Sequence, residues 1–467
     1  MVDPSHELPA PPRTTVDPAA IPEAVRTLCQ TLAARGHRAW VVGGCVRDHL
    51  LGRDVNDWDI CTTAPPRELL KTFPKAIPTG LEHGTVTVVR EGHHYEVTTL
   101  RGEAGYSDGR RPDKVVFLDD IAADLARRDF TVNAIAYDPL GDAMVDPFDG
   151  RGDLARRVLR AVGDADQRFN EDGLRILRGA RFAATLEFAL DDATERAMEQ
   201  ALPVFRKVSA ERVRDEWMKT MKAAAPSRAF AVMLRRGILG VVAPELVACV
   251  GCAQEPARHR FDVWEHTLRT LDACPKDAVL RIAALLHDIG KPAVAMRDAS
   301  GRVDFPAHDR AGAERADAWL RAWRFSNDER LRVTHVILHH LVEYTPAWTD
   351  ADVRRFVQRV GAGALADVFG LARADAIGAD IDVEPRLEGL SALERHVAAV
   401  QQAGAALTAR DLAVDGNVLM RELGIKPSRQ LGVLLAALLE RAVDDPAVNT
   451  REGLLAIARE MLASDER

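Results

Sequence analysis

Residues 39–48 read Ala-Trp-Val-Val-Gly-Gly-Cys-Val-Arg-Asp, an apolar stretch that runs straight into two glycines. Consecutive apolar residues at Ala39–Val42 predict a buried strand. Gly43 and Gly44 would let the backbone approach a ligand where a side chain would intrude. A helix opening at Arg47 would aim its free amide groups at the same place. Phosphate is the natural occupant of such a turn.

Two aspartates follow the glycine turn, in the sequence Asp57-Trp58-Asp59-Ile60. In an extended segment, Asp57 and Asp59 share one face while Trp58 and Ile60 point into the core. Adjacent carboxylates repel unless a cation lies between them, and Mg²⁺ commonly binds carboxylates together with substrate phosphate oxygens. The order of these features predicts a site for a nucleoside triphosphate and its metal ions, and therefore phosphoryl or nucleotidyl transfer. The plain alternative is a turn followed by a solvated acidic loop.

Further segments follow in order along the chain: Arg127–Ala134, Asp146–Arg160, Glu171–Phe182 and Val208–Val213. Together with the glycine turn and its aspartates, they resemble the motifs of the poly(A) polymerase and tRNA CCA-adding nucleotidyltransferases, in their bacterial class II form. The resemblance weakens beyond Leu239. One departure is Gly173, where the family usually has proline. Proline is preorganised at a helix start and glycine is not, so we expect a looser helix start.

The resemblance implies a multidomain α+β chain with a polymerase-beta-like mixed α/β head, an all-α neck, a helical HD domain and a helical tail. The expected boundaries are 1–20 for a disordered tail, 21–160 for the head, 161–240 for the RNA-binding neck, 241–400 for the HD domain and 401–467 for the tail. After Val158 the strand signals fade and the sequence becomes overwhelmingly helical.

The implied activity is template-independent addition of CCA to the 3′ end of tRNA from CTP and ATP, by two-metal nucleotidyl transfer with Mg²⁺. The implied catalytic and metal-binding carboxylates are Asp57 and Asp59, with Glu96 as a third acidic group from a predicted hairpin, Thr85–Arg90 and His93–Leu100. The nucleotide-binding candidates are Gly43, Gly44, Arg47, Arg128, Asp129, Asn133, Asp172, Arg175, Arg178 and Arg181.

The predicted helix from Asp172 to Phe182 carries a polar residue at every third position: Asp172, Arg175, Arg178 and Arg181. Such residues form a ridge on one side, while Leu174 and Leu177 turn to the core. A carboxylate and a guanidinium on adjacent turns can pair with a base edge. Cytosine and adenine offer an exocyclic amine beside a ring acceptor, whereas guanine and uracil do not. The alternative is an exposed helix with an i, i+3 ion pair.

A second set of chemical groups lies in the C-terminal half. Val279–Ile289 is an apolar helix that ends in His287-Asp288, with His266 upstream and Asp375 in a later alanine-rich helix. These residues resemble the HD phosphohydrolases, helical bundles that bind a divalent metal through nitrogen and oxygen ligands. The resemblance implies phosphatase or cyclic phosphodiesterase activity on RNA ends or nucleotides. The alternative is a retained fold with an idle site.

Other histidines and basic residues are weaker candidates. His308 and His339 are possible extra ligands, although the pair His339-His340 by itself is typical of a surface. Lys426 and Arg429 flank a turn before an apolar helix and are candidates for contacting the tRNA body, or simply connect two helices. The loop 101–113 is expected to be mobile, with side chains that could order over a substrate: Tyr106, Asp108, Arg110 and Arg111.

Composition restricts the remaining possibilities. The net charge of −8 hides a basic segment, residues 151–181, with eight arginines against five acidic residues, which suits a phosphate backbone. Cys249 and Cys252 form a lone C-x-x-C without the further ligands of a zinc site, so the six cysteines are expected to be reduced. No apolar run approaches the roughly 20 residues of a membrane span, and a cytoplasmic location is expected.

Three other functions remain open from the sequence. An enzyme of the same class could add only A or polymerise A on other RNAs. An HD metallophosphohydrolase could use its N-terminal half only to bind RNA. A non-catalytic RNA-binding protein would have neither activity.

Overall fold

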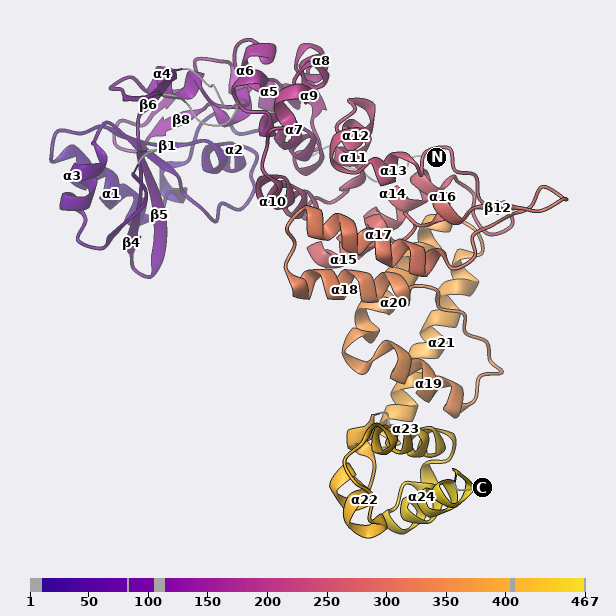
Figure 1. Ribbon diagram of the computed structural model, residues 1–467. Helices are drawn as coiled ribbons and strands as arrows, with labels where there is room; N and C mark the ends of the chain where they lie inside the picture. The colour runs from indigo at the N-terminus through magenta and orange to yellow at the C-terminus, as the bar shows by residue number, and fades with distance from the viewer. Residues whose placement is uncertain (1–10, 82–83, 105–113, 404–407, 466–467) are drawn as a thin grey trace. The chain divides into compact units, whose positions relative to one another are not determined.

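The computed structural model describes residues 11–81, 84–104, 114–403 and 408–465 of the chain (Figure 1). Its contacts divide the chain into two compact units, residues 1–244 and 245–467. This division lies within a few residues of the boundary expected at 240. The expected head and neck form one compact unit, and so do the expected HD domain and tail.

The first unit contains a seven-stranded mixed sheet with the order β3-β4-β5-β2-β1-β8-β9. Its strands are β1 Ala39–Val42, β2 Ile60–Thr62, β3 Ala76–Gly80, β4 Thr85–Arg90, β5 His93–Thr99, β8 Ala136–Asp138 and β9 Ala143–Val145. Two small pairs accompany it, β6 Arg101–Ala104 with β7 Lys114–Phe117 and β10 Val158–Leu159 with β11 Ala189–Leu190. The mixed sheet of the head was expected and is confirmed.

The helices of the first unit precede, interrupt and follow this sheet. They are α1 Glu23–Ala33, α2 Gly44–Leu50, α3 Pro66–Thr72, α4 Ile121–Ala126, α5 Gly150–Arg156, α6 Ala165–Glu171, α7 Leu174–Thr185, α8 Asp192–Gln200, α9 Leu202–Phe205, α10 Ala210–Thr220, α11 Ser227–Arg235 and α12 Leu239–Val242. After β11 this unit is entirely helical within the described residues, as predicted for the neck.

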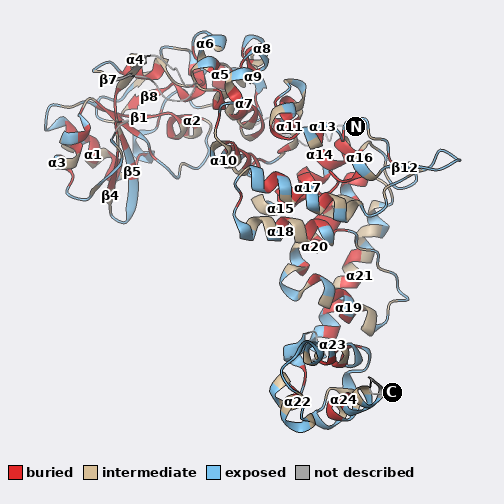
Figure 2. Ribbon diagram, in the orientation of Figure 1, coloured by how far each residue is buried: buried red, intermediate tan, exposed pale blue. Residues whose placement is uncertain are grey.

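The predicted strand and hairpin form where the sequence places them. All residues of β1 are buried, which suits a central strand paired with β2 and β8 (Figure 2). The β4–β5 hairpin turns at Glu91-Gly92, and both residues have positive φ angles of 53° and 79°. β2 and β5 run parallel, although the sheet is otherwise antiparallel.

Two expected irregular segments contain ordered structure. Residues 11–20, expected to be disordered, pack on the head, because Val16 is fully buried and the Arg13 amide donates to the Leu50 carbonyl at 2.7 Å. Residues 101–104, expected to begin a loop, pair with β7. The candidate side chains of that loop, at 106, 108, 110 and 111, lie outside the described residues.

The second unit is a helical assembly whose only described strands are the short pair β12 Met296–Arg297 and β13 Val303–Asp304. Its helices are α13 Pro244–Val247, α14 Val263–Ala273, α15 Ala278–Leu286, α16 Lys291–Val294, α17 His308–Ala322, α18 Asn327–Leu338, α19 Asp350–Val360, α20 Leu365–Ala379, α21 Val383–Gln402, α22 Gly416–Leu423, α23 Arg429–Asp444 and α24 Arg451–Asp465. Across the described residues, no helix has the length and apolarity that a membrane crossing requires.

Separate apolar clusters stabilise different parts of the second unit. One is built from α19, α20 and α21, with Phe356 and Leu393 among its buried residues. Another joins the last three helices around Leu419 and Leu438. The last three helices therefore have a small core of their own, although they belong to the same compact unit.

Candidate functional site

Asp57, Asp59 and Glu96 form an acidic cluster at the sheet of the first unit, where the charges of Glu96 and Asp57 both act on Asp59. Trp58 and Ile60 are buried while Asp57 and Asp59 are exposed, so the predicted alternation is correct. Ile60 of β2 pairs with Val97 of the parallel strand β5. Asp59 and Glu96 each precede that pair by one residue and therefore share a face.

This acidic cluster is electrostatically strained without a cation. The pKa of Asp59 is raised to about 6, first by withdrawal from bulk water and then by the charge of Glu96, with a smaller contribution from Asp57. Arg128 partly offsets these effects. More than a third of the Asp59 surface remains accessible, so an incoming ion can reach the carboxylate. The cluster fits the hard-oxygen preference of a divalent cation such as Mg²⁺.

The glycine turn lies directly under Arg128. Gly43 has φ 77° and ψ −124°, and a Cβ at this position would lie 2.6 Å from Arg128 Nη1. Only glycine fits this backbone conformation without strain. Because the chain turns at Gly43 itself, α2 begins at Gly44, three residues before the helix start predicted at Arg47. The prediction of a strand, glycine turn and helix is correct, and its helix boundary is wrong.

A chain of polar contacts joins this turn to the neck. Arg47 Nη1 donates to Asn133 Oδ1 at 2.5 Å, and Asn133 Nδ2 donates to Asp129 Oδ1 at 3.1 Å. Arg178 Nε of α7 then donates to Asp129 Oδ2 at 2.8 Å. Burial would raise the pKa of Asp129, but Arg178 and Asn133 outweigh it and hold that pKa far below its usual range. These predicted nucleotide-binding residues therefore orient one another.

The predicted recognition helix is α7, which starts at Leu174 and continues to Thr185, beyond the expected end at Phe182. Leu174 and Leu177 are buried as predicted. Asp172 lies just before the helix and receives both guanidinium nitrogens of Arg212, at 3.1 and 2.6 Å.

The arginines of α7 are also held by neighbours. Arg175 donates to Glu171 at 2.6 Å and to two main-chain carbonyls, and Arg181 donates to the buried Glu216 at 2.6 Å. Sequence reasoning did not identify Arg212 or Glu216 as partners. Arg212 lies within the segment Val208–Val213 that the sequence analysis singled out, but nothing in that segment indicates its partner.

The unusual Gly173 has a packing reason. A Cβ at this position would lie 2.6 Å from the backbone Cα and N of Phe205, in α9. Helix α9 therefore approaches the start of α7 more closely than any side chain allows, and proline would not fit without moving it. The looser helix start expected from glycine is offset by this contact.

In the second unit, the residues predicted as HD-type ligands come together. His266 Nε2 lies 3.2 Å from His287 Nε2 and 3.0 Å from Asp375 Oδ1. Asp288 Oδ2 lies 3.4 Å from His266 Nε2 and 3.2 Å from His287 Nε2. We call these four residues the quartet. Atoms that share one ion at about 2.1 Å are about 3 Å apart when they are adjacent in an octahedron, so the quartet fits one divalent cation.

Close helix packing positions the quartet. A Cβ at Gly378 of α20 would lie 2.2 Å from Thr270 Oγ1 of α14. This close approach brings Asp375, one turn before Gly378, to His266, one turn before Thr270. The predicted apolar helix forms, but α15 ends at Leu286 rather than Ile289, so His287 caps the helix and Asp288 lies in the turn that follows.

The quartet is deeply buried, and His266, His287 and Asp288 are at most 1% exposed. Burial would lower the pKa of His287, but Asp288 and Asp375 outweigh it and raise the pKa to about 10. The pKa values of both carboxylates are held well below their usual range by the two histidines, despite burial. A divalent cation bound here would replace the His287 proton, and its larger charge would neutralise the two carboxylates more fully.

Two nearby residues differ from the expectation. His340, expected at the surface, is 3% exposed and its Nε2 lies 3.9 Å from Asp288 Oδ1, whereas His339 packs its ring on His335. The ligand prediction for His339 is therefore wrong, because α18 ends at Leu338 and the chain turns the next histidine inward. Lys291, which the sequence reasoning missed, is buried and donates to Asp288 Oδ2 at 2.7 Å. Its signal was its position three residues after that aspartate.

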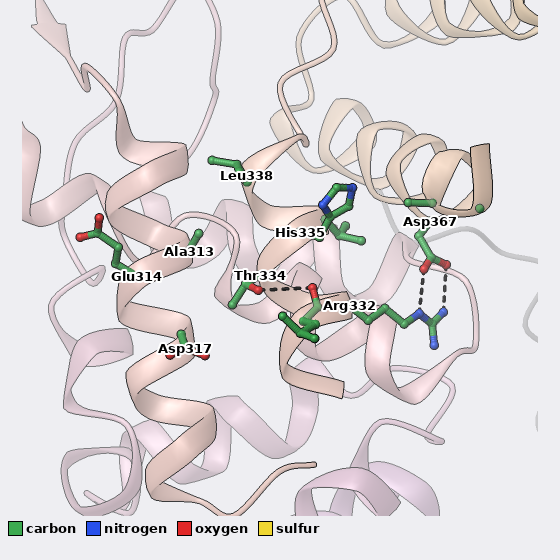
Figure 3. A pocket seen from close by; sticks show the side chains of 12 residues that line it. Ala313, Glu314, Asp317, Arg332, Thr334, His335, Leu338 and Asp367 are labelled. Carbon is green, nitrogen blue, oxygen red and sulfur yellow. Dashed lines mark hydrogen bonds and ion pairs between the residues drawn. The ribbon is translucent and has the colours of Figure 1, made fainter. Parts of the chain in front are cut away.

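A cavity of about 820 Å³ opens beside the quartet. Asp375, His308 and His340 line it, and its charged lining is mixed, with basic residues Arg258, Lys291, Arg302 and Arg386 and acidic residues Glu255, Asp304, Glu343 and Asp382. A second cavity of about 810 Å³ lies between α17 and α18 (Figure 3). There Arg332 is bound by both oxygens of Asp367, and Asp317 by Arg330 at 2.7 Å, so its charges are largely satisfied internally.

The remaining candidates are simple to place. Lys426 and Arg429 are both exposed, and Arg429 is the first residue of α23 while Lys426 lies three residues before it. The six cysteines are free thiols, as predicted. Burial raises the pKa of Cys249, which suits an inert structural thiol.

Comparisons with known proteins agree with this architecture. Family models match residues 39–160 ("Poly A polymerase head domain"), 187–249 ("Probable RNA and SrmB- binding site of polymerase A") and 310–458 ("tRNA nucleotidyltransferase domain 2 putative"). The chain is 35% identical to a CCA-adding enzyme of Lactobacillus delbrueckii, over 91% of this chain and 94% of that one. It is 33% identical to a CCA-adding enzyme of Streptococcus pyogenes, over 92% and 94%.

Solved structures show the same similarity. The CCA-adding enzyme of Bacillus stearothermophilus in complex with CTP superposes with a TM-score of 0.71 and 29% identity, over 95% of this chain and 98% of that one. The Thermotoga maritima CCA-adding enzyme complexed with tRNA shares the fold at a TM-score of 0.57 and 19% identity, over 95% and 97%.

Proposed function

The chain belongs to the family of CCA-adding enzymes, and we propose that it completes the 3′ end of tRNA by adding C, C and A from CTP and ATP. The observation that carries this proposal is the acidic cluster of Asp57, Asp59 and Glu96, with Asp59 and Glu96 on one sheet face and Arg128 between this cluster and the Gly43 turn. The cytoplasm, where tRNA and nucleoside triphosphates meet, is its expected location.

Enzymes of this family depend on divalent metal, and we infer that Asp57 and Asp59 hold two Mg²⁺ ions. Two bound ions would lower the pKa of the attacking RNA hydroxyl and stabilise charge on the leaving pyrophosphate. The protein's own contribution is orientation. Gly43 admits the triphosphate close to the backbone, Arg128 lies over that turn, and Arg47 is fixed by Asn133.

Base selection is assigned to Asp172 and Arg175. Arg212 holds the Asp172 carboxylate, and Glu171 holds the Arg175 guanidinium, so both groups are oriented before a nucleotide arrives. A carboxylate has enough lone pairs to accept from a base amine as well as from Arg212. Arg178 and Arg181, tied to Asp129 and Glu216, would support this ridge and the triphosphate beside it.

The test is incubation with a tRNA transcript that lacks its last three nucleotides, followed by sizing of the product. CTP alone should add two residues, and CTP with ATP should add three. Extension by a single A, or a long A tract, would replace the proposal with the A-adding or poly(A) alternative. Incorporation of GTP or UTP as readily as CTP would remove the base-selection role of Asp172 and Arg175.

We also propose a second activity, metal-dependent hydrolysis of phosphate esters in the second unit. The quartet and the cavity beside it support this proposal. Lys291 and Arg386 line this cavity, where each pairs with a carboxylate of the quartet. His266, His287, Asp288 and Asp375 would hold the cation, which would activate water and stabilise charge on the phosphate.

Phosphate release from p-nitrophenyl phosphate and from RNA ending in a 2′,3′-cyclic phosphate tests this activity, measured with Mn²⁺, Ni²⁺ and Zn²⁺ in turn. Release that disappears in His287→Ala supports the assignment. An intact, metal-loaded protein that hydrolyses neither substrate would contradict it.

Lys426→Ala with Arg429→Ala tests the tail: weaker binding of whole tRNA but not of a short acceptor hairpin would support a contact with the tRNA body.

A further inference from the structure

Three arginine side chains of the first unit gather around one phenylalanine ring. The guanidinium carbon of Arg181 lies 3.9 Å from the centre of the Phe182 ring. Those of Arg47 and Arg178 lie 5.3 and 5.4 Å from the same centre. Arg47 belongs to α2, which follows the glycine turn, whereas Arg178 and Arg181 belong to α7. The ring therefore lies where the phosphate-binding turn meets the recognition helix.

Three positive charges so close together repel one another. Burial lowers the pKa of Arg181, the charge of Arg178 lowers it further, and Glu216 offsets these effects only in part. Each guanidinium has a carboxylate partner: Asp48 for Arg47, Asp129 for Arg178 and Glu216 for Arg181. These partners come from separate parts of the chain, so each ion pair by itself fixes one arginine and not the group.

The Phe182 ring is shared by all three arginines. An aromatic ring carries partial negative charge on its faces and attracts a cation within about 6 Å of its centre, more strongly where water is excluded. Phe182 is 6% exposed, so water screens this attraction little. Because one ring attracts all three guanidinium groups, it couples the position of the arginine in α2 to the positions of the two in α7.

The neighbouring core fixes the orientation of this ring. Phe130 packs edge to face with Phe182, at a centroid distance of 5.8 Å and an interplanar angle of 80°. Phe130 is fully buried and contacts Phe169 in turn, at 6.2 Å. A Cβ at Gly179 would lie 2.4 Å from Met198 Cε and 3.2 Å from Phe130 Cζ, so α7 packs closely on this cluster. The ring is therefore held in place before a nucleotide arrives.

We propose that Phe182 is a positioning residue for the incoming nucleotide, whose ring holds the three guanidinium groups together as one surface for the triphosphate. This inference rests on the proposed addition of C and A, and it deepens that function by naming a group that acts only through the arginines. CTP and ATP share the same triphosphate. The ring therefore serves both nucleotides equally and takes no part in the choice of base, unlike Asp172 and Arg175.

The test changes the charge distribution of the ring and leaves its shape nearly constant. Phe182 is replaced site-specifically by mono-, di- and trifluorophenylalanine, because each fluorine withdraws negative charge from the ring faces. The KM for CTP and the KM for ATP should rise together at each step, by about tenfold in total. The kcat and the KM for tRNA should not change. A side chain that only fills space would show no such series.

Conventional variants give a second reading. Phe182→Leu removes the ring and should raise both nucleotide KM values at least as much as trifluorophenylalanine, whereas Phe182→Tyr keeps the ring and should stay close to the parent. The matched control is Phe230, a fully buried phenylalanine of α11 that packs on Trp217 at 5.0 Å. Phe230→Leu, and trifluorophenylalanine at Phe230, should leave both KM values unchanged. Circular dichroism checks that every variant is folded.

Constant nucleotide KM values across the fluorinated series, in folded proteins, would overturn the proposal. A rise for CTP without a rise for ATP would also overturn it, because the ring would then act on the base.

The affinity for CTP, measured by isothermal titration calorimetry, separates this inference from the proposed function. A parent protein that adds no nucleotide to tRNA, but whose CTP affinity falls with each fluorine, would remove the proposed function and leave the role of Phe182 standing. A parent protein that adds CCA, with a CTP affinity that does not respond to the fluorines, would do the reverse.

Discussion

The two candidate metal centres differ in how the protein presents its ligands. In the first unit, Asp57, Asp59 and Glu96 are exposed carboxylates that act on one another electrostatically. In the second unit, His266 and His287 are fully buried and mix nitrogen with oxygen. An exposed acidic cluster suits ions that arrive and leave with a triphosphate, whereas a buried mixed site suits a resident ion. We therefore expect the first centre to bind its ions transiently and the second to keep its ion.

The largest expected effect separates the two centres by mutation. Asp57→Ala should lower CTP incorporation by on the order of 1,000-fold or more, because the ions and the triphosphate lose a ligand that they share. Phosphate release by the second unit should not change. Primer extension and phosphate release, measured on one preparation, check both statements. Asp54→Ala, on the same exposed loop, is the matched control and should remain active. Equal loss of both activities would show that the two activities do not belong to separate centres.

His287→Ala should have the opposite pattern. Removing a buried ligand leaves Asp288 and Asp375 without their partner, so we expect loss of the resident cation and at least a 100-fold loss of phosphate release, as for a metal ligand. CTP incorporation should stay within about twofold of the parent enzyme. Elemental analysis and primer extension provide the two readouts. A protein that keeps its metal after this change would show that the quartet is not the binding site.

The two centres should also differ in pH dependence. A cation in the second unit must displace the His287 proton, whose pKa is about 10, so its affinity should rise about tenfold per pH unit between pH 6 and 9. In the first unit, the pKa of Asp59 is about 6. The Mg²⁺ concentration that gives half-maximal incorporation should therefore be constant above pH 7 and increase as the pH falls below 6.

Glu96→Gln sharpens this comparison, because it removes one charge that raises the pKa of Asp59. The acid limb of the Mg²⁺ profile should move to lower pH in this variant, while the affinity of the second unit for its cation keeps the parent slope. An unchanged acid limb would show that the charge of Glu96 has no effect on Mg²⁺ binding at Asp59.

The smallest expected effect concerns packing. Gly378→Ala places a Cβ 2.2 Å from Thr270 Oγ1, so α14 and α20 must separate, at a cost of about 1–3 kcal/mol in the free energy of unfolding. Because these helices carry His266 and Asp375, cation retention should weaken too. Gly432→Ala, where a Cβ would have open space, is the control. Denaturant unfolding measures both variants, and equal stability would show that the close contact is not required.

The sequence predicted the first centre better than the second for a physical reason. Asp57, Asp59 and the glycine turn lie close together in the chain, so strand alternation alone put Trp58 inside and the carboxylates outside. The helix boundary at Gly44 was missed, because it depends on the positive φ of Gly43.

The second centre depends on contacts between distant helices. The quartet could be named from its residue types, but the inward position of His340 follows from where α18 ends, and the role of Lys291 from its burial. The ion pairs of Asp172 with Arg212 and of Arg181 with Glu216 likewise join separate helices. Such long-range partners leave no local pattern in one sequence.

The most direct test of the central claim is anomalous scattering from crystals grown with Mn²⁺, collected with and without CTP. We predict a strong peak between Asp57 and Asp59 that appears only with CTP, and peaks beside Asp288 in both crystals. Bound CTP with no anomalous peak at the two aspartates would contradict the account of the first unit as a metal-dependent nucleotidyltransferase.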